Sequence, residues 1–228
     1  MNVLVIAPHP DDDVLGCGGV MARHADSGDA VHVAVVTRGD PRLFPEEQVS
    51  QVRAELASAH RILGVAGREF LDFPAPRTDT VGQHEIVERL RDVLRSVAPQ
   101  TIYLPHRADC HADHRIVFSA ALAAARSTPR CTVRRILCYE TLSETEWAPP
   151  AGDAAFLPTR FVDIASTVDR KLGAFACFAS QWFPPPHPRS LESIERLARL
   201  RGATAGLTAA EAFAVVCDVV TSEESSVP

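Results

Sequence analysis

The chain opens with the stretch MNVLVIAPHPDDDVLGCGG (residues 1–19), in which a short apolar run leads directly into a His/Asp cluster. Residues 3–7 are apolar and rich in β-branched side chains, which is typical of a strand buried on both faces. Residues 14–27 then have a helical composition and are followed by Gly28. A buried strand that runs at once into a helix predicts the first unit of an α/β fold.

The same alternation continues outward along the chain. We expect strands at residues 3–7, 31–37, 69–73, 101–104, 135–139 and 161–164, and helices at residues 14–27, 46–63, 83–97, 114–126, 169–180 and 190–201. A short segment at residues 209–216 ends the fold, and its type is left open. Strands that alternate with helices of these lengths imply right-handed βαβ units. The predicted fold class is therefore α/β and Rossmann-like: a mostly parallel sheet with helices on both faces, in a single domain with a helical C-terminal part.

The size and composition agree with one globular domain. The chain has 228 residues, of which 46% are hydrophobic and 23% are charged, which is enough apolar material for one sizeable core. No internal repeat or low-complexity linker divides it. We expect the domain to cover residues 1–220 and the polar, acidic residues 221–228 to form a disordered tail.

Charge and cysteine usage exclude several classes of partner. The net charge of −6 argues against nucleic acid, whose phosphates require clustered Lys and Arg. The first residues lack a basic segment and a signal-like apolar run, and no run approaches the roughly 20 apolar residues of a membrane span. The six cysteines show no CxxC spacing and are interpreted as reduced thiols. We therefore expect a cytoplasmic protein without a membrane partner.

Two His/Asp clusters follow two of the predicted strands. The first is PHPDDD (residues 8–13) and the second is PHRADCHADH (residues 105–114). The carboxyl ends of parallel strands lie at one edge of the sheet, so both clusters should contribute to one site. Each cluster alone could be a turn whose carboxylate caps the next helix. Together they favour a metal, because three consecutive carboxylates repel one another without a nearby positive charge, and imidazole with carboxylate suits Zn²⁺.

The motifs PHPDDD (residues 8–13) and HADH (residues 111–114) resemble those of the LmbE-like, or PIG-L, family of zinc-dependent N-acetylglucosamine deacetylases. In that family the first motif usually ends in Glu, where this chain has Asp13. Residues 37–40 (TRGD), 53–55 (RAE) and 63–64 (LG) resemble a second block of the family. Residues 171–181, 201–202 and 210–213 resemble its C-terminal half, so the resemblance extends over most of the chain.

The resemblance implies a set of metal ligands, namely His9, Asp12 and His114. Two imidazoles and one carboxylate leave a fourth position open, as a catalytic zinc site requires. Zn²⁺ is the expected cofactor, although Fe²⁺ accepts the same ligand set.

The resemblance also implies three catalytic residues. Asp11 would be the general base that takes a proton from the attacking water. His111 would donate to the oxyanion and later protonate the leaving amine, and Asp113 would orient His111. Some relatives carry Tyr two residues before this His, where this chain has Asp109.

Asp40 and Arg53 match family positions that contact the sugar, with Arg53 expected to brace Asp40. A surface ion pair is the open alternative for both. The proline-rich residues 184–189, which include His187, either rim the pocket or form a plain exposed loop.

These inferences predict a zinc-dependent N-deacetylase that hydrolyses the acetamide of a small molecule containing N-acetylglucosamine, such as a glycoside, a nucleotide sugar or an antibiotic intermediate. The partner is thus a small amino-sugar substrate, and because relatives often self-associate, a homo-oligomer is compatible with the resemblance. One alternative is a metal-dependent amidase that acts on a non-sugar amide or a thiol conjugate. A non-enzymatic binding module is a third hypothesis, and it is disfavoured because binding alone needs no general base.

Overall fold

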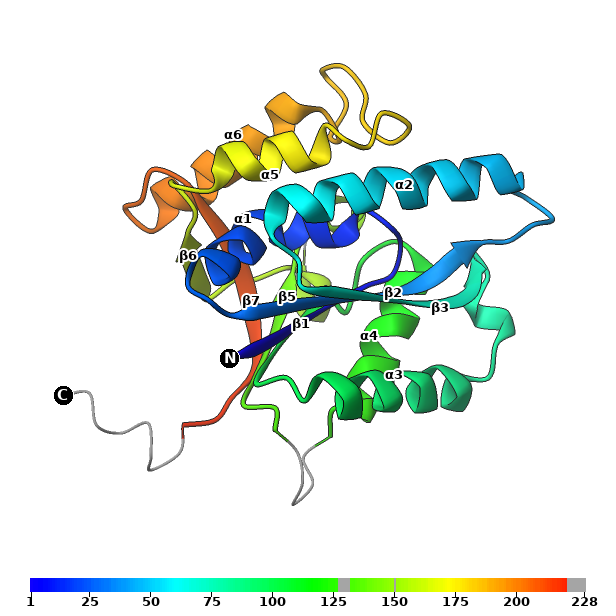
Figure 1. The fold of residues 1–228 in the computed structure, drawn as a ribbon. Coiled ribbons are helices and arrows are strands. Elements are labelled where there is room, and N and C mark those ends of the chain that lie inside the picture. The colour runs from blue at the N-terminus through cyan, green and yellow to red at the C-terminus, as the bar shows by residue number, and fades with distance from the viewer. Residues whose placement is uncertain (127–131, 150, 221–228) are drawn as a thin grey trace.

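The computed structural model describes residues 1–126, 132–149 and 151–220, which form one α/β domain around a seven-stranded sheet (Figure 1). The predicted tail at residues 221–228 lies outside the described residues. The strands are β1 (Asn2–Ala7), β2 (Ala30–Gly39), β3 (Gly67–Ala75), β4 (Thr101–Pro105), β5 (Arg135–Tyr139), β6 (Arg160–Asp163) and β7 (Ala210–Asp218). The α-helices are α1 (Asp12–Asp26), α2 (Glu46–Leu63), α3 (Gln83–Val97), α4 (Ala112–Ala124), α5 (Val168–Phe175) and α6 (Leu191–Thr204). Among these helices, none is both long and apolar enough to cross a membrane.

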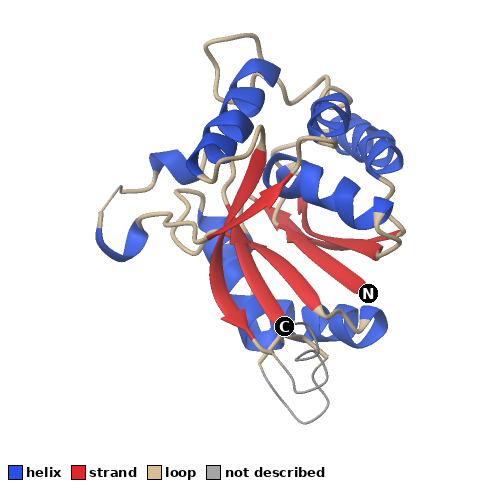
Figure 2. Ribbon diagram, turned by 90° about the vertical axis from the view of Figure 1, so that its left-hand side faces the viewer, coloured by secondary structure: helices blue, strands red, loops and turns tan. Residues whose placement is uncertain are grey.

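The sheet has the strand order β3-β2-β1-β4-β5-β7-β6, in which the first five strands are parallel. The chain therefore reverses its direction of winding between β1 and β4. Figure 2 shows the twist that carries the strands across the domain. In open sheets of this kind ligands bind at the carboxyl ends of the strands beside this switch point. The predicted fold class is confirmed.

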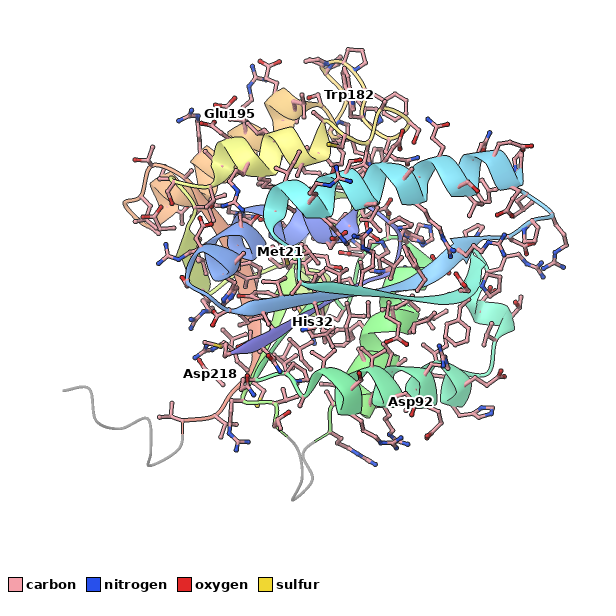
Figure 3. The ribbon with its side chains drawn as sticks, in the orientation of Figure 1. Met21, His32, Asp92, Trp182, Glu195 and Asp218 are labelled. Atoms are coloured by element: carbon pink, nitrogen blue, oxygen red, sulfur yellow. The ribbon has the colours of Figure 1, made fainter. Side chains whose placement is uncertain are left out.

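The sheet separates two apolar cores. Helices α1, α2, α5 and α6 cover one face, and α3 and α4 cover the other (Figure 1). The side chains of β1 alternate between them, with Val3, Val5 and Ala7 in the first core and Leu4 and Ile6 in the second. A strand buried on both faces has no polar positions, which explains the continuous apolar run in the sequence. Met21 on α1 lies in the first core, between its helix and the sheet (Figure 3).

Helix α1 lies unusually close to the sheet. A Cβ atom at Gly16 would stand 2.2 Å from Cδ2 of Tyr139 on β5, so only glycine permits this approach. The Tyr139 hydroxyl donates to the carbonyl of Ile6 on β1 at 2.9 Å. This packing fixes the first turn of α1, which carries the acidic motif, against the ends of the central strands.

The structure corrects several predicted boundaries. Helix α5 ends at Phe175 rather than at residue 180, and the chain then turns so that the Phe178 side chain is buried in the first core. Strand β3 continues through Pro74 to Ala75, past the predicted end at residue 73. Because β3 is the edge strand, the missing N–H of Pro74 does not break a ladder on its outer side.

The segment at residues 209–216, whose type the sequence left open, forms β7. It pairs antiparallel with β5 on one side and with β6 on the other. A buried ion pair anchors it, because Nζ of Lys171 on α5 contacts Oε1 of Glu211 at 2.6 Å. The Glu211 carboxylate also accepts the backbone N–H groups of Gly19 and Val20, at 2.9 and 2.7 Å. The C-terminal half is thereby tied to α1.

Candidate active site

The two His/Asp clusters meet at the switch point of the sheet. Strands β1 and β4 are parallel neighbours, with Val3 opposite Thr101 and Val5 opposite Tyr103. Each strand ends directly before one of the clusters, so the loop after β1 and the loop after β4 face one another. This register brings the two clusters together in one site, as predicted from the sequence.

The side chains of His9, Asp12 and His114 converge on a small triangle of ligand atoms. Oδ2 of Asp12 lies 3.1 Å from Nδ1 of His9 and 3.2 Å from Nε2 of His114, and the two nitrogen atoms are 3.3 Å apart. Ligand atoms at the zinc–nitrogen or zinc–oxygen bond length stand about 3.3 Å apart in a tetrahedral site. The three atoms therefore form one face of such a tetrahedron without further adjustment.

The burial of this triangle supports the same interpretation. Asp12 and His114 are fully buried, and His9 is largely buried. The second oxygen of Asp12, Oδ1, is buried and has no hydrogen-bond partner among the described residues. An unpartnered carboxylate oxygen beside two imidazoles is costly unless a cation compensates it. The donor set thus fits a divalent metal ion.

The local backbone holds Asp12 in place without a metal ion. The N–H groups of Asp11 and Asp12 both donate to the carbonyl of His9, at 2.9 and 3.4 Å, which closes a tight turn at the start of α1. Oδ2 of Asp12 accepts the backbone N–H of His9 at 2.8 Å. Carboxylates are also stabilised at a helix N-terminus by the helix dipole. The turn at residues 9–12 therefore positions the carboxylate of Asp12 through its own hydrogen bonds.

Two further carboxylates orient the imidazole rings. Oδ2 of Asp113 lies 3.1 Å from Nε2 of His9, and Oδ2 of Asp109 lies 2.8 Å from Nδ1 of His114. Asp113 is itself held by the N–H and hydroxyl of Thr78, and Asp109 by the hydroxyl of Thr145. Such carboxylates fix the tautomer of a histidine so that its other nitrogen faces the metal.

These contacts change the acidity of both rings. Burial lowers the pKa of His9, but hydrogen bonds to Asp113 and Asp12 outweigh it and raise that pKa to about 9. Burial also lowers the pKa of His114, but the charge of Asp12 and the hydrogen bond to Asp109 raise it to about 10. In the metal-free protein both imidazoles therefore hold protons at neutral pH, and a metal ion must displace them.

The role expected for Asp113 is corrected by its contacts. The carboxylate was expected to orient His111, but it contacts His9 and Thr78. His111 is connected to Asp113 through the backbone, because Nδ1 of His111 accepts the Asp113 N–H at 3.1 Å. This contact caps α4 and leaves Nε2 as the nitrogen that carries the proton of the neutral ring.

Asp11 lies beside the triangle and faces the same cavity. The residue is 3% exposed, and Oδ2 accepts from Nη1 of Arg189 at 2.9 Å. Burial raises the pKa of Asp11 to about 6, against the opposing charge of Arg189. A carboxyl group with such a pKa is suited to proton transfer near neutral pH.

The third acid of the motif has a different task. Oδ2 of Asp13 contacts Nε2 of His60 at 2.7 Å, and both side chains are fully buried. This pair joins α1 to α2 beneath the site, and Asp13 contacts neither the ligand triangle nor the cavity lining among the described residues. Asp13 therefore acts as a structural link.

A cavity of about 500 Å³ opens over the site. Its inner end is formed by His9, Asp11 and His111. Its walls are formed by the end of β2 and the loop after it, the N-terminal half of α2, the loops after β3 and β5, and the loop between α5 and α6. They include Arg38, Phe44, Gln48, Val52, Arg53, Pro76, Glu144, Gln181 and Arg189. A volume in this range accommodates a small-molecule ligand.

The two predicted sugar contacts are placed apart from one another. Arg53 lines the cavity, forms an ion pair with Asp72 and stacks its guanidinium over the ring of Phe70, 4.3 Å from the centroid. Asp40 is buried and accepts from Arg42 and from Nη1 of Arg77, the latter at 3.0 Å. Arg53 thus pairs with Asp72 rather than bracing Asp40, and the described lining of the cavity does not include Asp40.

Three residues that contact the site chemistry were missed in the sequence. In the sequence, Asp109 stands out only as the position at which some relatives carry Tyr, although its place directly after β4 puts it at the same edge of the sheet. Thr78 lies in a turn after β3 and has no motif around it, whereas Arg189 belongs to the proline-rich segment that was expected to rim the pocket or to form an exposed loop. Within the proline-rich residues 184–189, Arg189 lines the cavity, and Nδ1 of His187 accepts the Arg189 N–H at 3.0 Å.

Asp109→Asn is expected to weaken metal binding by about 10- to 100-fold, because an amide favours the wrong tautomer of His114. Isothermal titration with Zn²⁺ would measure the effect. Asp92→Asn is the matched control, since Asp92 lies on the exposed side of α3 and pairs only with Arg95 among the contacts described (Figure 3). Equal affinities of the Asp109 variant and the parent protein would show that this carboxylate does not support the site.

Comparisons with known proteins agree with this geometry. A sequence profile of the family described as GlcNAc-PI de-N-acetylase, or PIG-L, matches residues 4–125, a span that contains both clusters. The chain is 32% identical over 168 residues to the uncharacterized deacetylase YaiS of Escherichia coli, across 72% of this chain and 82% of that protein. It is 27% identical to the diacetylchitobiose deacetylase of Thermococcus kodakarensis, across 79% and 70% of the two chains.

Relatives also include a protein named for a different reaction. The chain is 28% identical to the 4-oxalmesaconate hydratase of Pseudomonas putida, across 79% of this chain and 74% of that protein. Among solved structures, the conserved protein TT1542 of Thermus thermophilus superimposes with a TM-score of 0.78 at 29% identity, covering 97% of each chain. The fold is thus shared with TT1542, and the span matched by the family profile includes both clusters.

Proposed function

Because the chain belongs to the PIG-L family of GlcNAc-PI de-N-acetylases, we propose that it is a zinc-dependent N-deacetylase that hydrolyses the acetamide of a small molecule containing N-acetylglucosamine. The observation that carries this proposal is the ligand triangle of His9, Asp12 and His114, which lies beside a buried acid in one cavity. A site for binding alone would not need Asp11. Relatives that are deacetylases of amino-sugar compounds support the substrate class.

His9, Asp12 and His114 would hold the metal ion, which when bound polarises the acetamide carbonyl and makes water a stronger nucleophile. Asp11 accepts a proton from the attacking water, because its carboxylate faces the cavity beside the ligand triangle. His111 donates from Nε2 to the oxygen that becomes negative, since its Nδ1 is occupied by the Asp113 N–H. Asp113 contributes by orienting His9.

The neutral form of His111 suits the role of a donor. Burial and the neighbouring His9 and His114 lower the pKa of His111. The ring is therefore neutral at neutral pH and donates a hydrogen bond without charge. A proton taken up by Asp11 can then return to the leaving amine, which replaces the expectation that His111 supplies it.

Arg53 is the residue that we assign to substrate binding. Its guanidinium would donate hydrogen bonds to ring hydroxyls of the sugar or to an anionic group of the substrate. Arg53→Met keeps an unbranched aliphatic side chain and removes the guanidinium with its donors, so kcat/KM should fall by about 10- to 100-fold while metal content stays unchanged. Asp40→Ala provides the comparison, because Asp40 holds Arg42 and Arg77, and we expect it to lower thermal stability more than kcat/KM. A reversed pattern would assign the sugar contact to Asp40.

The proposed function is tested by incubating purified, zinc-loaded protein with a panel of substrates and measuring acetate release, amide cleavage and hydration. The panel should contain an N-acetylglucosamine glycoside, a nucleotide sugar, a non-sugar acetamide, a thiol-conjugate amide and an unsaturated dicarboxylate. Turnover of the amino sugars with loss of activity on chelation is the expected result. Hydrolysis of the other amides alone would move the protein to the amidase alternative. Hydration of the dicarboxylate alone would replace the deacetylase assignment.

A cytoplasmic location is a further proposal, and it rests on the cysteines. The five cysteines in the described part of the chain are free thiols, and Cys17 and Cys138 are buried as small apolar side chains. Free, buried thiols are typical of reducing compartments.

A further inference from the structure

Arg189 connects three loops that meet at the catalytic end of the cavity. Its Nη1 donates to Oδ2 of Asp11 in the loop after β1 at 2.9 Å, and its Nε donates to Oγ of Ser143 in the loop after β5 at 2.9 Å. Arg189 itself lies in the loop before α6. Its side chain is 16% exposed, so most of the guanidinium is shielded from water.

The backbone on either side of Arg189 is fixed. The Arg189 N–H donates to Nδ1 of His187 at 3.0 Å, and the hydroxyl of Ser193 donates to the carbonyl of His187 at 3.1 Å. Ser190, the next residue, caps α6 by accepting the N–H of Ser193 at 3.1 Å. Prolines at positions 184–186 and 188 restrict the preceding backbone further. The guanidinium is therefore presented to the cavity from a rigid support.

Each acid of the motif has its own partner. Asp12 contacts His9 and His114, and Asp13 contacts His60. For the Asp11 carboxylate, the one hydrogen-bond and ion-pair partner among the described residues is Arg189. Without that contact, the Asp11 carboxylate would be free to rotate away from the cavity, or toward the imidazoles that Asp12 already occupies. The geometry of the base therefore depends on a residue from the far end of the chain.

We infer that Arg189 is a positioning residue, which holds the Asp11 carboxylate in the orientation from which it accepts a proton. The inference rests on the proposed function, because it concerns the base of that reaction. It makes the loop before α6 part of the catalytic apparatus, so changes in this loop alter turnover without changing the metal ligands. The role differs from substrate binding, since Arg189 acts through Asp11.

The test is a double-mutant cycle with Arg189→Met, Asp11→Asn and the combined variant. Arg189→Met alone should lower kcat by about 10- to 100-fold, with KM and bound metal nearly unchanged, because misplacing a catalytic group slows the chemical step. In the Asp11→Asn background, Arg189→Met should lower kcat by less than about twofold, because the carboxylate that Arg189 positions is already absent. Losses that multiply in the combined variant would overturn the inference, since a structural role or direct substrate contact acts independently of Asp11.

Three further single variants and one double variant keep the result interpretable. Arg189→Lys retains the charge and should recover part of the lost kcat, even if the Met variant folds poorly. Arg196→Met is the control, because Arg196 lies exposed on α6 and pairs with Glu192 one turn away. Adding methylguanidinium to the Arg189→Ala variant should restore activity. It should not restore activity in a double variant that carries both Arg189→Ala and Asp11→Asn. Absence of rescue, together with an inactive Lys variant, would count against a guanidinium that orients the base.

A failure of the proposed function would be visible separately. If the parent protein hydrolyses none of the amino-sugar acetamides, the deacetylase assignment fails and the kinetic cycle cannot be interpreted as above. Crystal structures of the parent protein and of Arg189→Met then decide the inference. A displaced Asp11 carboxylate in the variant supports it, and an unmoved carboxylate contradicts it.

Discussion

Asp11→Asn is expected to keep its metal and lose about 10²- to 10⁴-fold in kcat, which is the usual cost of removing a general base. The amide has the shape of the carboxylate and can still accept from Nη1 of Arg189, so the cavity should keep its form. An amide cannot take a proton from water. The loss should therefore appear in kcat, while the affinity for substrate and metal changes little.

The pH dependence offers a second readout of the same residue. Because burial raises the pKa of Asp11 to about 6, the base is ionised above that pH and activity is lost as the pH falls through it. A bound cation favours the ionised carboxylate and moves this limb to lower pH. The Asp11→Asn variant should lack the limb. A variant with nearly parental kcat and an unchanged pH profile would assign the base to another group.

His114→Ala and His9→Ala are expected to abolish stoichiometric metal binding. Each change removes one corner of a triangle whose edges are 3.1 to 3.3 Å, so the remaining two ligands cannot hold the ion as a set. Elemental analysis after dialysis would measure the metal content. His84→Ala is the control, because His84 is an exposed histidine on α3. Retention of metal by both ligand variants would show that the assignment of ligands is wrong.

Metal binding should also depend steeply on pH. The pKa of His9 is raised to about 9 and that of His114 to about 10 in the metal-free protein, so binding at pH 7 must release protons. Affinity for Zn²⁺ should therefore rise between pH 6 and pH 9, and titrations in buffers of different ionisation enthalpy would count the protons released. An affinity independent of pH across this range would contradict protonated ligands.

The stability of the metal-free protein should fall as the pH rises, whereas its affinity for Zn²⁺ increases. A histidine whose pKa is raised on folding stabilises the folded state fully below its unfolded pKa of about 6.5, and this contribution is lost as the pH rises through the folded value. For His9 and His114 that loss falls between pH 7 and about 10. The Tm of metal-free protein should thus fall over this window, while metal-loaded protein keeps its Tm.

The sequence by itself determined the fold class and the position of the site. The continuous apolar run of β1 reflects burial on both faces, and the helical periodicity of residues 46–63 and 83–97 matches α2 and α3. These signals are local, because the period of a strand or helix is set by its own backbone geometry. The site followed from a general property of parallel sheets, since clusters that come directly after parallel strands lie at one edge.

Only the tertiary structure decided which partner each polar side chain takes. The sequence placed Asp113 beside His111, but the fold turns its carboxylate to His9 and Thr78. Asp11 and Arg189 are 178 positions apart, and no periodicity or spacing connects them. The type of the last strand was equally hidden, because an antiparallel β7 depends on its pairing with β5 and β6 rather than on its own residues. Such contacts arise when distant segments pack together, so their physical cause lies in the assembled core and not in any local stretch of the chain.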